Sequence, residues 1–136
     1  MALPTVGGGY QQNDGNLNEP IIGKAPAPAT ATSTATLTTT QLLSGILLGS
    51  PGSSAASYTT PTGTQIDDAL SNAKVGSTFD LSIQNVDGSG SGVITLVGGT
   101  GVTISGLATV AATAGTSQIW RFRRTGTGTY TAYRYG

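Results

Sequence analysis

Four of the six basic side chains in this sequence are arginines that lie in its last sixteen residues. Aromatic side chains lie beside these arginines in the sequence: Trp120, Phe122, Tyr130, Tyr133 and Tyr135. This combination is typical of surfaces that bind nucleic acid or sugars, and it is also the composition that protein interfaces favour. The formal net charge is zero, so no long-range field attracts nucleic acid. We therefore interpret the segment as an interface between subunits, with Asp67 or Asp80 as partners of its arginines. The predicted interface residues are Trp120, Arg121, Phe122, Arg123 and Tyr133.

Other groupings of reactive side chains are weaker candidates. Asp67 and Asp68 are adjacent, so on a helix they point about 100° apart and do not form a paired acid and base. The glycine-rich stretches 87–92 and 98–101 lack the lysine and the strand-to-helix context of a phosphate-binding loop. The segment after Asp87 also lacks the repeated acidic residues of a calcium loop. We expect no metal site.

The sequence has no cysteine and no histidine. It therefore has no disulfide, no Cys/His zinc site and no Ser-His-Asp triad. The few carboxylates are scattered through glycine-rich segments. We expect a protein that is not an enzyme and has no cofactor and no small-molecule substrate.

Composition indicates β-structure. Charged residues make up 9% of the 136 residues, where about 25% is usual. The 21 glycines and the many β-branched side chains suit strands joined by tight turns. The length fits one domain with an appendage.

The regular spacing of turn residues predicts about eight short strands. The pattern over residues 77–86 is the clearest, because Phe79, Leu81, Ile83 and Asn85 alternate with polar residues. One amphipathic helix is expected over residues 60–73, with Thr60 as its N-cap and Pro61 at its first position. Residues 41–45 fit either a helical turn or the start of a strand. The predicted strands are 46–50, 55–60, 77–86, 93–99, 101–106, 108–113, 117–125 and 128–136.

These elements predict an all-β fold: an antiparallel β-sandwich or jelly-roll-like domain over residues 36–136, with one short helix. Residues 1–35 are rich in proline and glycine and keep no period. They fit either a disordered tail or an extended arm that binds a partner surface through isolated apolar residues. No signal peptide is evident, and the apolar run at 42–48 is too short to span a membrane. The candidate anchoring residues of the arm are Leu3, Val6, Tyr10, Leu17, Ile21 and Ile22.

Several stretches occur in an order that resembles a known β domain. This domain is found in virion proteins of tailed bacteriophages, among them head decoration (cement) proteins and segments of tail fibres. The resemblance covers residues 36–136 and implies a homotrimer, with a flexible arm on the capsid shell and a compact domain above it. The stretches are TLTTTQLLSGILL, SYTTPTGTQIDDAL, VGSTFDLSIQN and ITLVGGTGVTISG, followed by the aromatic and basic strands.

The resemblance implies a structural virion protein on the outer surface of the capsid. Its expected partner is the major capsid protein, with no nucleic acid and no membrane involved. Three linked arms would hold contacts that one arm alone cannot hold, and the trimer would stabilise contacts between capsomers. The alternative is a tail-fibre or receptor-binding module that attaches to the virion by its arm and binds host glycans.

Overall fold

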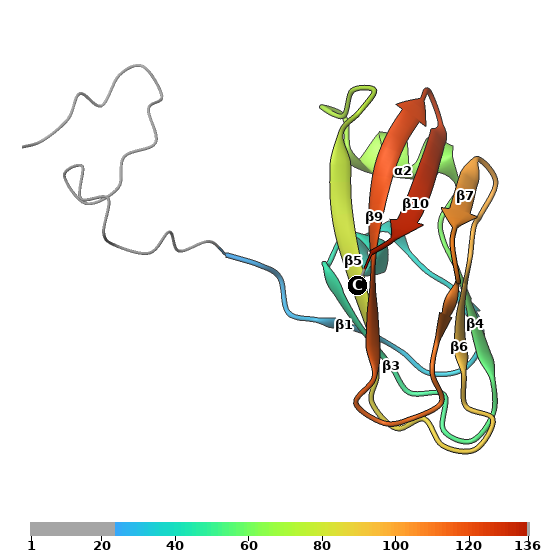
Figure 1. Ribbon diagram of the computed structural model, residues 1–136. Helices are drawn as coiled ribbons and strands as arrows, with labels where there is room; N and C mark the ends of the chain where they lie inside the picture. Colours follow the sequence, from blue (N-terminus) through green and yellow to red (C-terminus); the bar gives the residue numbers. More distant parts are fainter. Residues whose placement is uncertain (1–23, 136) are drawn as a thin grey trace, which may run out of the picture.

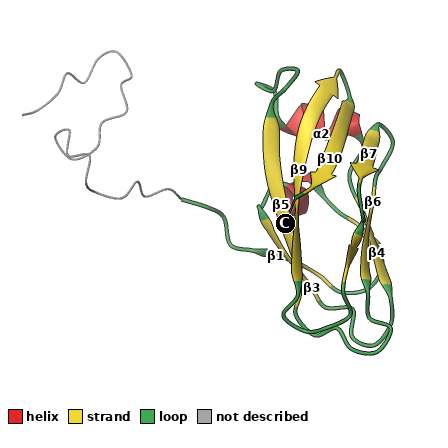
Figure 2. Cartoon of the chain, viewed as in Figure 1, coloured by secondary structure: helices red, strands yellow, loops and turns green. Residues whose placement is uncertain are grey.

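The computed structural model describes residues 24–135 of the chain, and most of the regular structure in this range is β-strand (Figures 1 and 2). Two short helices accompany the strands, where the sequence predicted one. The six-stranded sheet contains β1 (Ala29–Ala31), β3 (Ile46–Gly49), β5 (Thr78–Asn85), β7 (Val102–Ser105), β9 (Ser117–Gly126) and β10 (Thr129–Arg134). The four-stranded sheet contains β2 (Ala35–Thr36), β4 (Ala56–Thr59), β6 (Ile94–Val97) and β8 (Thr109–Val110).

The chain alternates between the two sheets from β1 to β9. The larger sheet has the order β1-β3-β5-β9-β10-β7, and the smaller has the order β2-β4-β6-β8. Each strand from β3 to β6 pairs with the strand two positions earlier in the chain, and all four of these pairs are parallel. A parallel pair needs a crossover connection, and here each crossover contains a strand of the other sheet. The first six strands thus form three turns of a flattened coil.

The prediction of an antiparallel fold is wrong for these strands. Both sheets are mixed, and β7 also runs parallel to its neighbour β10. Antiparallel pairing is confined to β5 with β9, β9 with β10, and β6 with β8 among the strands described. Regular turn signals mark where the chain reverses, but they do not say which sheet it enters next.

The C-terminal hairpin is the clearest short-range element of the fold. β9 and β10 are joined by a tight turn in which Gly128 has a φ of 65°, a conformation that glycine adopts without strain. On its other side β9 pairs with β5, so that Asp80 lies opposite Arg121 and Phe79 lies opposite Phe122. With β5 on one side and β10 on the other, the arginine-rich strand β9 lies in the middle of the six-stranded sheet.

Both helices begin with the same local motif. In α1 (Thr39–Leu42) and α2 (Gly63–Ala69) a threonine hydroxyl accepts a hydrogen bond from the backbone N–H of a glutamine three residues later. The glutamine side chain accepts in return from the threonine N–H, which completes a capping box. The N-cap of α2 is Thr62, so the prediction of Thr60 was two residues early. The open alternative at 41–45 resolves as the end of α1.

One cluster of buried side chains contains residues from both sheets. The inward face of β5 is as predicted, because Leu81, Ile83 and Asn85 are fully buried. Asn85 is the polar member of this face. Its amide donates to the carbonyls of Gly92 and Ala111 at 2.9 and 3.0 Å, and its Oδ1 accepts from Gly88 N at 2.6 Å. Asn85 thus ties together the loops at one end of the domain.

The domain begins earlier in the chain than predicted. Ala29–Ala31 forms an edge strand of the larger sheet, Ala31 is 8% exposed, and the buried Tyr58 hydroxyl donates to its carbonyl. The boundary expected at residue 36 is therefore wrong, and the ordered β-structure starts at residue 29. Residues 24–28 are exposed and lead away from the domain (Figure 1).

Candidate functional site

The C-terminal hairpin distributes its arginines to two sides of the sheet. Along β9 the side chains of Trp120 and Phe122 point into the core, whereas Arg121 and Arg123 point outward. Arg124 is half-buried near the end of the strand and faces α2. This alternation follows from the two-residue period of a strand, and it creates two separate polar clusters.

The first cluster lies on the outer face of the six-stranded sheet. Arg121 donates from Nε to Asp80 Oδ1 at 2.9 Å and from Nη2 to Oδ2 at 3.2 Å. The Tyr135 hydroxyl donates to Asp80 Oδ2 at 2.6 Å, and the Arg121 guanidinium lies 4.8 Å from the centre of the Tyr135 ring. Arg121 and Asp80 are 52% and 41% exposed, so solvent screens the pair. The cluster presents a fixed, accessible arrangement of charged and aromatic groups.

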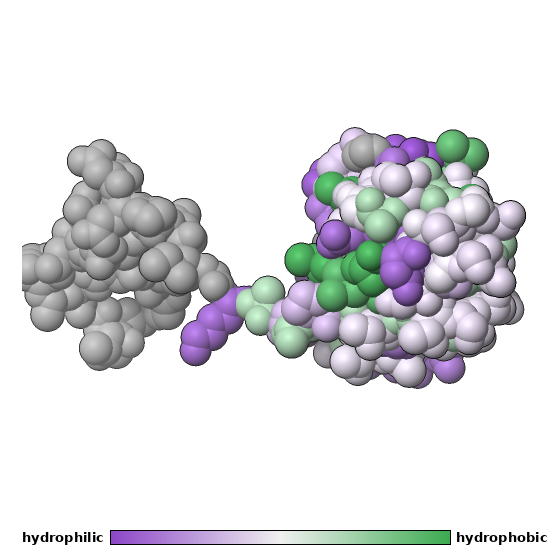
Figure 3. All heavy atoms as spheres, turned by 90° about the horizontal axis from the view of Figure 1, so that it is seen from below, coloured by the Kyte–Doolittle hydropathy of each residue, from purple (hydrophilic) through white to green (hydrophobic). Residues whose placement is uncertain are grey.

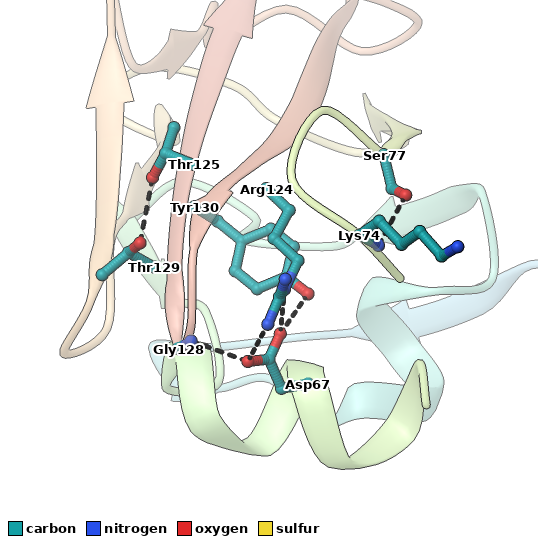
Figure 4. A network of polar contacts seen from close by, with 8 residues as sticks. All are labelled: Asp67, Lys74, Ser77, Arg124, Thr125, Gly128, Thr129 and Tyr130. Atoms are coloured by element: carbon teal, nitrogen blue, oxygen red, sulfur yellow. Dashed lines mark hydrogen bonds and ion pairs between the residues drawn. The ribbon is translucent and has the colours of Figure 1, made fainter. Parts of the chain in front are cut away.

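The second cluster joins α2 to the C-terminal hairpin (Figure 4). The carboxylate of Asp67 accepts from Arg124 Nε at 2.8 Å, Arg124 Nη2 at 3.0 Å, Gly128 N at 2.6 Å and the Tyr130 hydroxyl at 2.7 Å. Here the two charged side chains are only 18% and 15% exposed. Asp67 lies late in a seven-residue helix and outside its first turn, so its role is this tertiary contact and not a charge complement to the helix N-terminus.

The hydrogen bonds in both clusters shift the pKa values of the groups that they join. Donation from Arg124, together with Tyr130 and Gly128, holds the pKa of Asp67 well below its usual value. Burial, reinforced by the bond to Asp67, raises the pKa of Tyr130 to about 12. Arg121 and Tyr135 lower the pKa of Asp80 in the same way. Both carboxylates therefore remain ionised at neutral pH and are suited to structure rather than to proton transfer.

The predicted interface residues separate into two groups in the structure. Arg121, Arg123 and Tyr133 lie together on the outer face, because Tyr133 pairs with Arg121 in the register of β9 and β10. Trp120 and Phe122 are 0% exposed, so their assignment to a surface is wrong: they belong to the core of this chain. Asp80 binds Arg121 and Asp67 binds Arg124 within this chain.

Sequence reasoning missed several partners in these clusters. Tyr130 and Tyr135 were considered only among several aromatic residues, and Gly128 only as a turn residue. Once the β5–β9 register is known, Asp80 opposite Arg121 follows directly. Arg134 also has an intrachain role, since its Nε donates to Gln118 Oε1 at 3.0 Å.

The outer face carries apolar groups beside its charges. Ile46 of β3, Tyr133 and Tyr135 are 46%, 43% and 51% exposed. Figure 3 shows apolar atoms gathered on the underside of the domain, near the point where residues 24–28 join it. The predicted anchoring residues Leu3, Val6, Tyr10, Leu17, Ile21 and Ile22 lie outside the described residues.

Metal-binding arrangements are not found in the part of the chain that the structure describes. No group of three or more Asp, Glu, His or Cys side chains in residues 24–135 is placed to hold a metal ion. Within the same range, no helix has the length and apolar character needed to cross a membrane. The two polar clusters join strands and a helix to one another, and the outer face presents exposed charged and aromatic groups.

Comparison with known proteins gave no relative: no protein-family model, no curated protein and no solved structure matches this chain.

Proposed function

We propose that this chain is a structural virion protein of a tailed bacteriophage, a capsid decoration protein that binds the outer surface of the head as a homotrimer. The observation that carries the proposal is the position of the N-terminal segment. Residues 24–28 leave the β domain as an exposed, extended segment without regular secondary structure, beside an apolar patch (Figures 1 and 3). A domain of this kind can rest on a surface while its arm extends across that surface.

The two sheets fit a role as a rigid platform. We infer that they pack face to face as a β-sandwich, since one buried cluster draws on both of them. The parallel strand pairs depart from the antiparallel jelly roll that the sequence suggested. A rigid domain supports decoration because contacts between capsomers are then bridged by a body that does not deform.

The outer face of the larger sheet is proposed as the contact between copies. Arginine and tyrosine are enriched in the energetically dominant positions of interfaces, and Arg121, Arg123 and Tyr133 supply them here. Asp80 is close to Arg121 on the same face, so two or three copies can exchange these ion pairs across an interface. Trimerisation would link three arms and raise their effective concentration at the shell.

The test is co-sedimentation with undecorated capsids, comparing the full chain with a version that starts at Lys24. Decoration predicts stoichiometric binding of the full chain and loss of binding by the shorter one, with both chains folded. If the full chain does not bind the shells, the proposal fails. In that case the alternative, a host-surface module that binds glycans, becomes the better account.

A second experiment tests the interface. Arg121→Ala should lower the oligomer mass seen in sedimentation velocity, whereas Lys74→Ala, a change outside the outer face, should not. An unchanged oligomer in the Arg121→Ala variant would exclude this residue from the subunit contact.

A further inference from the structure

A pocket with a volume of about 360 Å³ lies at the end of the domain that carries α2. Its walls come from the C-terminal end of α2, the loop that follows the helix, the first residues of β5 and Tyr130 of β10. Residues 24–28 join the domain nearer its other end (Figure 1). The pocket therefore lies away from the point where this segment joins the domain.

The floor of the pocket is aromatic and fixed in place. Phe79 stacks on Phe122 with 4.9 Å between ring centroids and 5° between ring planes. Phe79 lines the pocket, whereas Phe122, which covers one face of the Phe79 ring, does not. The ring needs no rearrangement to receive a ligand, which lowers the entropic cost of binding.

The rest of the lining is neutral. Leu70 and the Tyr130 ring extend the apolar floor, while Ser71, Asn72 and Thr78 place hydroxyl and amide groups around it. The hydroxyl of Tyr130 already donates its proton to Asp67. The lining contains no Asp, Glu, Lys or Arg, so a charged ligand would lose water without gaining an opposite charge.

This chemistry suits one class of ligand in particular. The C–H groups on one face of a sugar ring carry partial positive charge and pack against the negative face of an aromatic ring. The hydroxyls at the sugar's edge form hydrogen bonds with neutral amide and hydroxyl side chains. We propose that this pocket binds one neutral sugar unit of a glycan. The inference rests on the pocket alone and does not depend on capsid decoration.

The test uses the full-length chain on an array of neutral and sialylated glycans. Glucose, galactose and N-acetylglucosamine are then titrated at millimolar concentration while backbone amides are followed by NMR. Binding of at least one neutral sugar, with shifts concentrated in residues 69–79, is the expected result. Binding to no neutral sugar, or only to sialylated glycans, would overturn the proposal.

Two variants tie binding to the pocket. Ser71→Trp fills the pocket from an exposed position, and Asn72→Ala removes an amide without filling it; each should weaken binding at least tenfold. Ser53→Trp is the matched control, since Ser53 is an exposed serine in the loop between β3 and β4. Equal binding by Ser71→Trp and the native chain would place the sugar elsewhere and refute the assignment.

Capsid co-sedimentation of Ser71→Trp separates this proposal from the preceding one. Loss of sugar binding with full binding to shells is the expected pattern. Loss of shell binding in Ser71→Trp but not in Ser53→Trp would assign the pocket to the capsid contact and overturn its role as a sugar site.

Discussion

Replacing Tyr130 by phenylalanine removes a single oxygen atom from the contact between α2 and the C-terminal hairpin. The hydroxyl donates to Asp67 Oδ1 at 2.7 Å, and the side chain is 2% exposed. Hydrogen bonds to charged groups contribute about 1.5–3 kcal/mol. The Asp67 carboxylate still accepts three hydrogen bonds, two from Arg124 and one from Gly128 N. We therefore expect the lower part of this range, about 1.5–2 kcal/mol, to be lost from the free energy of unfolding.

The measurement is urea unfolding followed by the fluorescence of Trp120, which is the only tryptophan of the chain and is fully buried. For a domain of this size the loss corresponds to a melting temperature lower by roughly 6–8 °C. Tyr133→Phe is the control, because Tyr133 is 43% exposed and should change stability little. A difference below about 0.5 kcal/mol for Tyr130→Phe would refute the stabilising role of this bond.

Alkaline pH provides an independent check of the same bond. The pKa of Tyr130 is raised from 10.0 in the unfolded chain to about 12 in the folded one. Below pH 10 the hydroxyl is protonated in both states, and its contribution to stability is complete. As the pH rises from 10 through about 12 the unfolded chain ionises first, so the contribution is lost. The stability difference between the native chain and Tyr130→Phe should shrink over this interval, and a constant difference would contradict the assignment.

Three further changes test other parts of the fold by the same fluorescence assay. Asn85→Ala removes the bonds to Gly88 N and to the Gly92 and Ala111 carbonyls, of which the Ala111 carbonyl alone keeps another donor, the Thr116 hydroxyl, and should cost about 2–4 kcal/mol; Gln84→Ala, on the opposite face, is its control, and equal losses would contradict the role of Asn85. Gly63→Ala would bring a methyl group onto the Gly128 carbonyl and should cost about 1–3 kcal/mol, unlike Thr64→Ala on the same helix; no loss would show that the two segments separate freely. A chain starting at Thr36 should be less stable than one starting at Lys24, because it lacks β1 and the carbonyls of Ala31 and Thr32 that accept from the buried Tyr58 hydroxyl; equal stabilities would return the domain boundary to residue 36.

Features that depend on neighbouring residues were predictable from the sequence. The alternation of β5 was correct, because the inward and outward faces of a strand follow directly from its two-residue period. The tight turn at Gly128 was also marked locally, by glycines between two strand-like segments. A helix was expected over residues 60–73 and is found at Gly63–Ala69; its predicted cap was displaced because Thr60 and Thr62 both offer a hydroxyl at a plausible position.

Features that depend on strand pairing were decided by the tertiary structure alone. The sequence shows Asp67 beside Asp68, but its partner Arg124 is 57 residues away, and only the packing of α2 on the hairpin brings them together. Trp120 and Phe122 alternate with arginines as an exposed interface strand would, yet two sheets enclose their side chains and bury them. The parallel coil of β1 to β6 has the same origin. Turn residues fix where the chain bends, whereas the burial of the inner faces of the two sheets in one core decides which strands become neighbours.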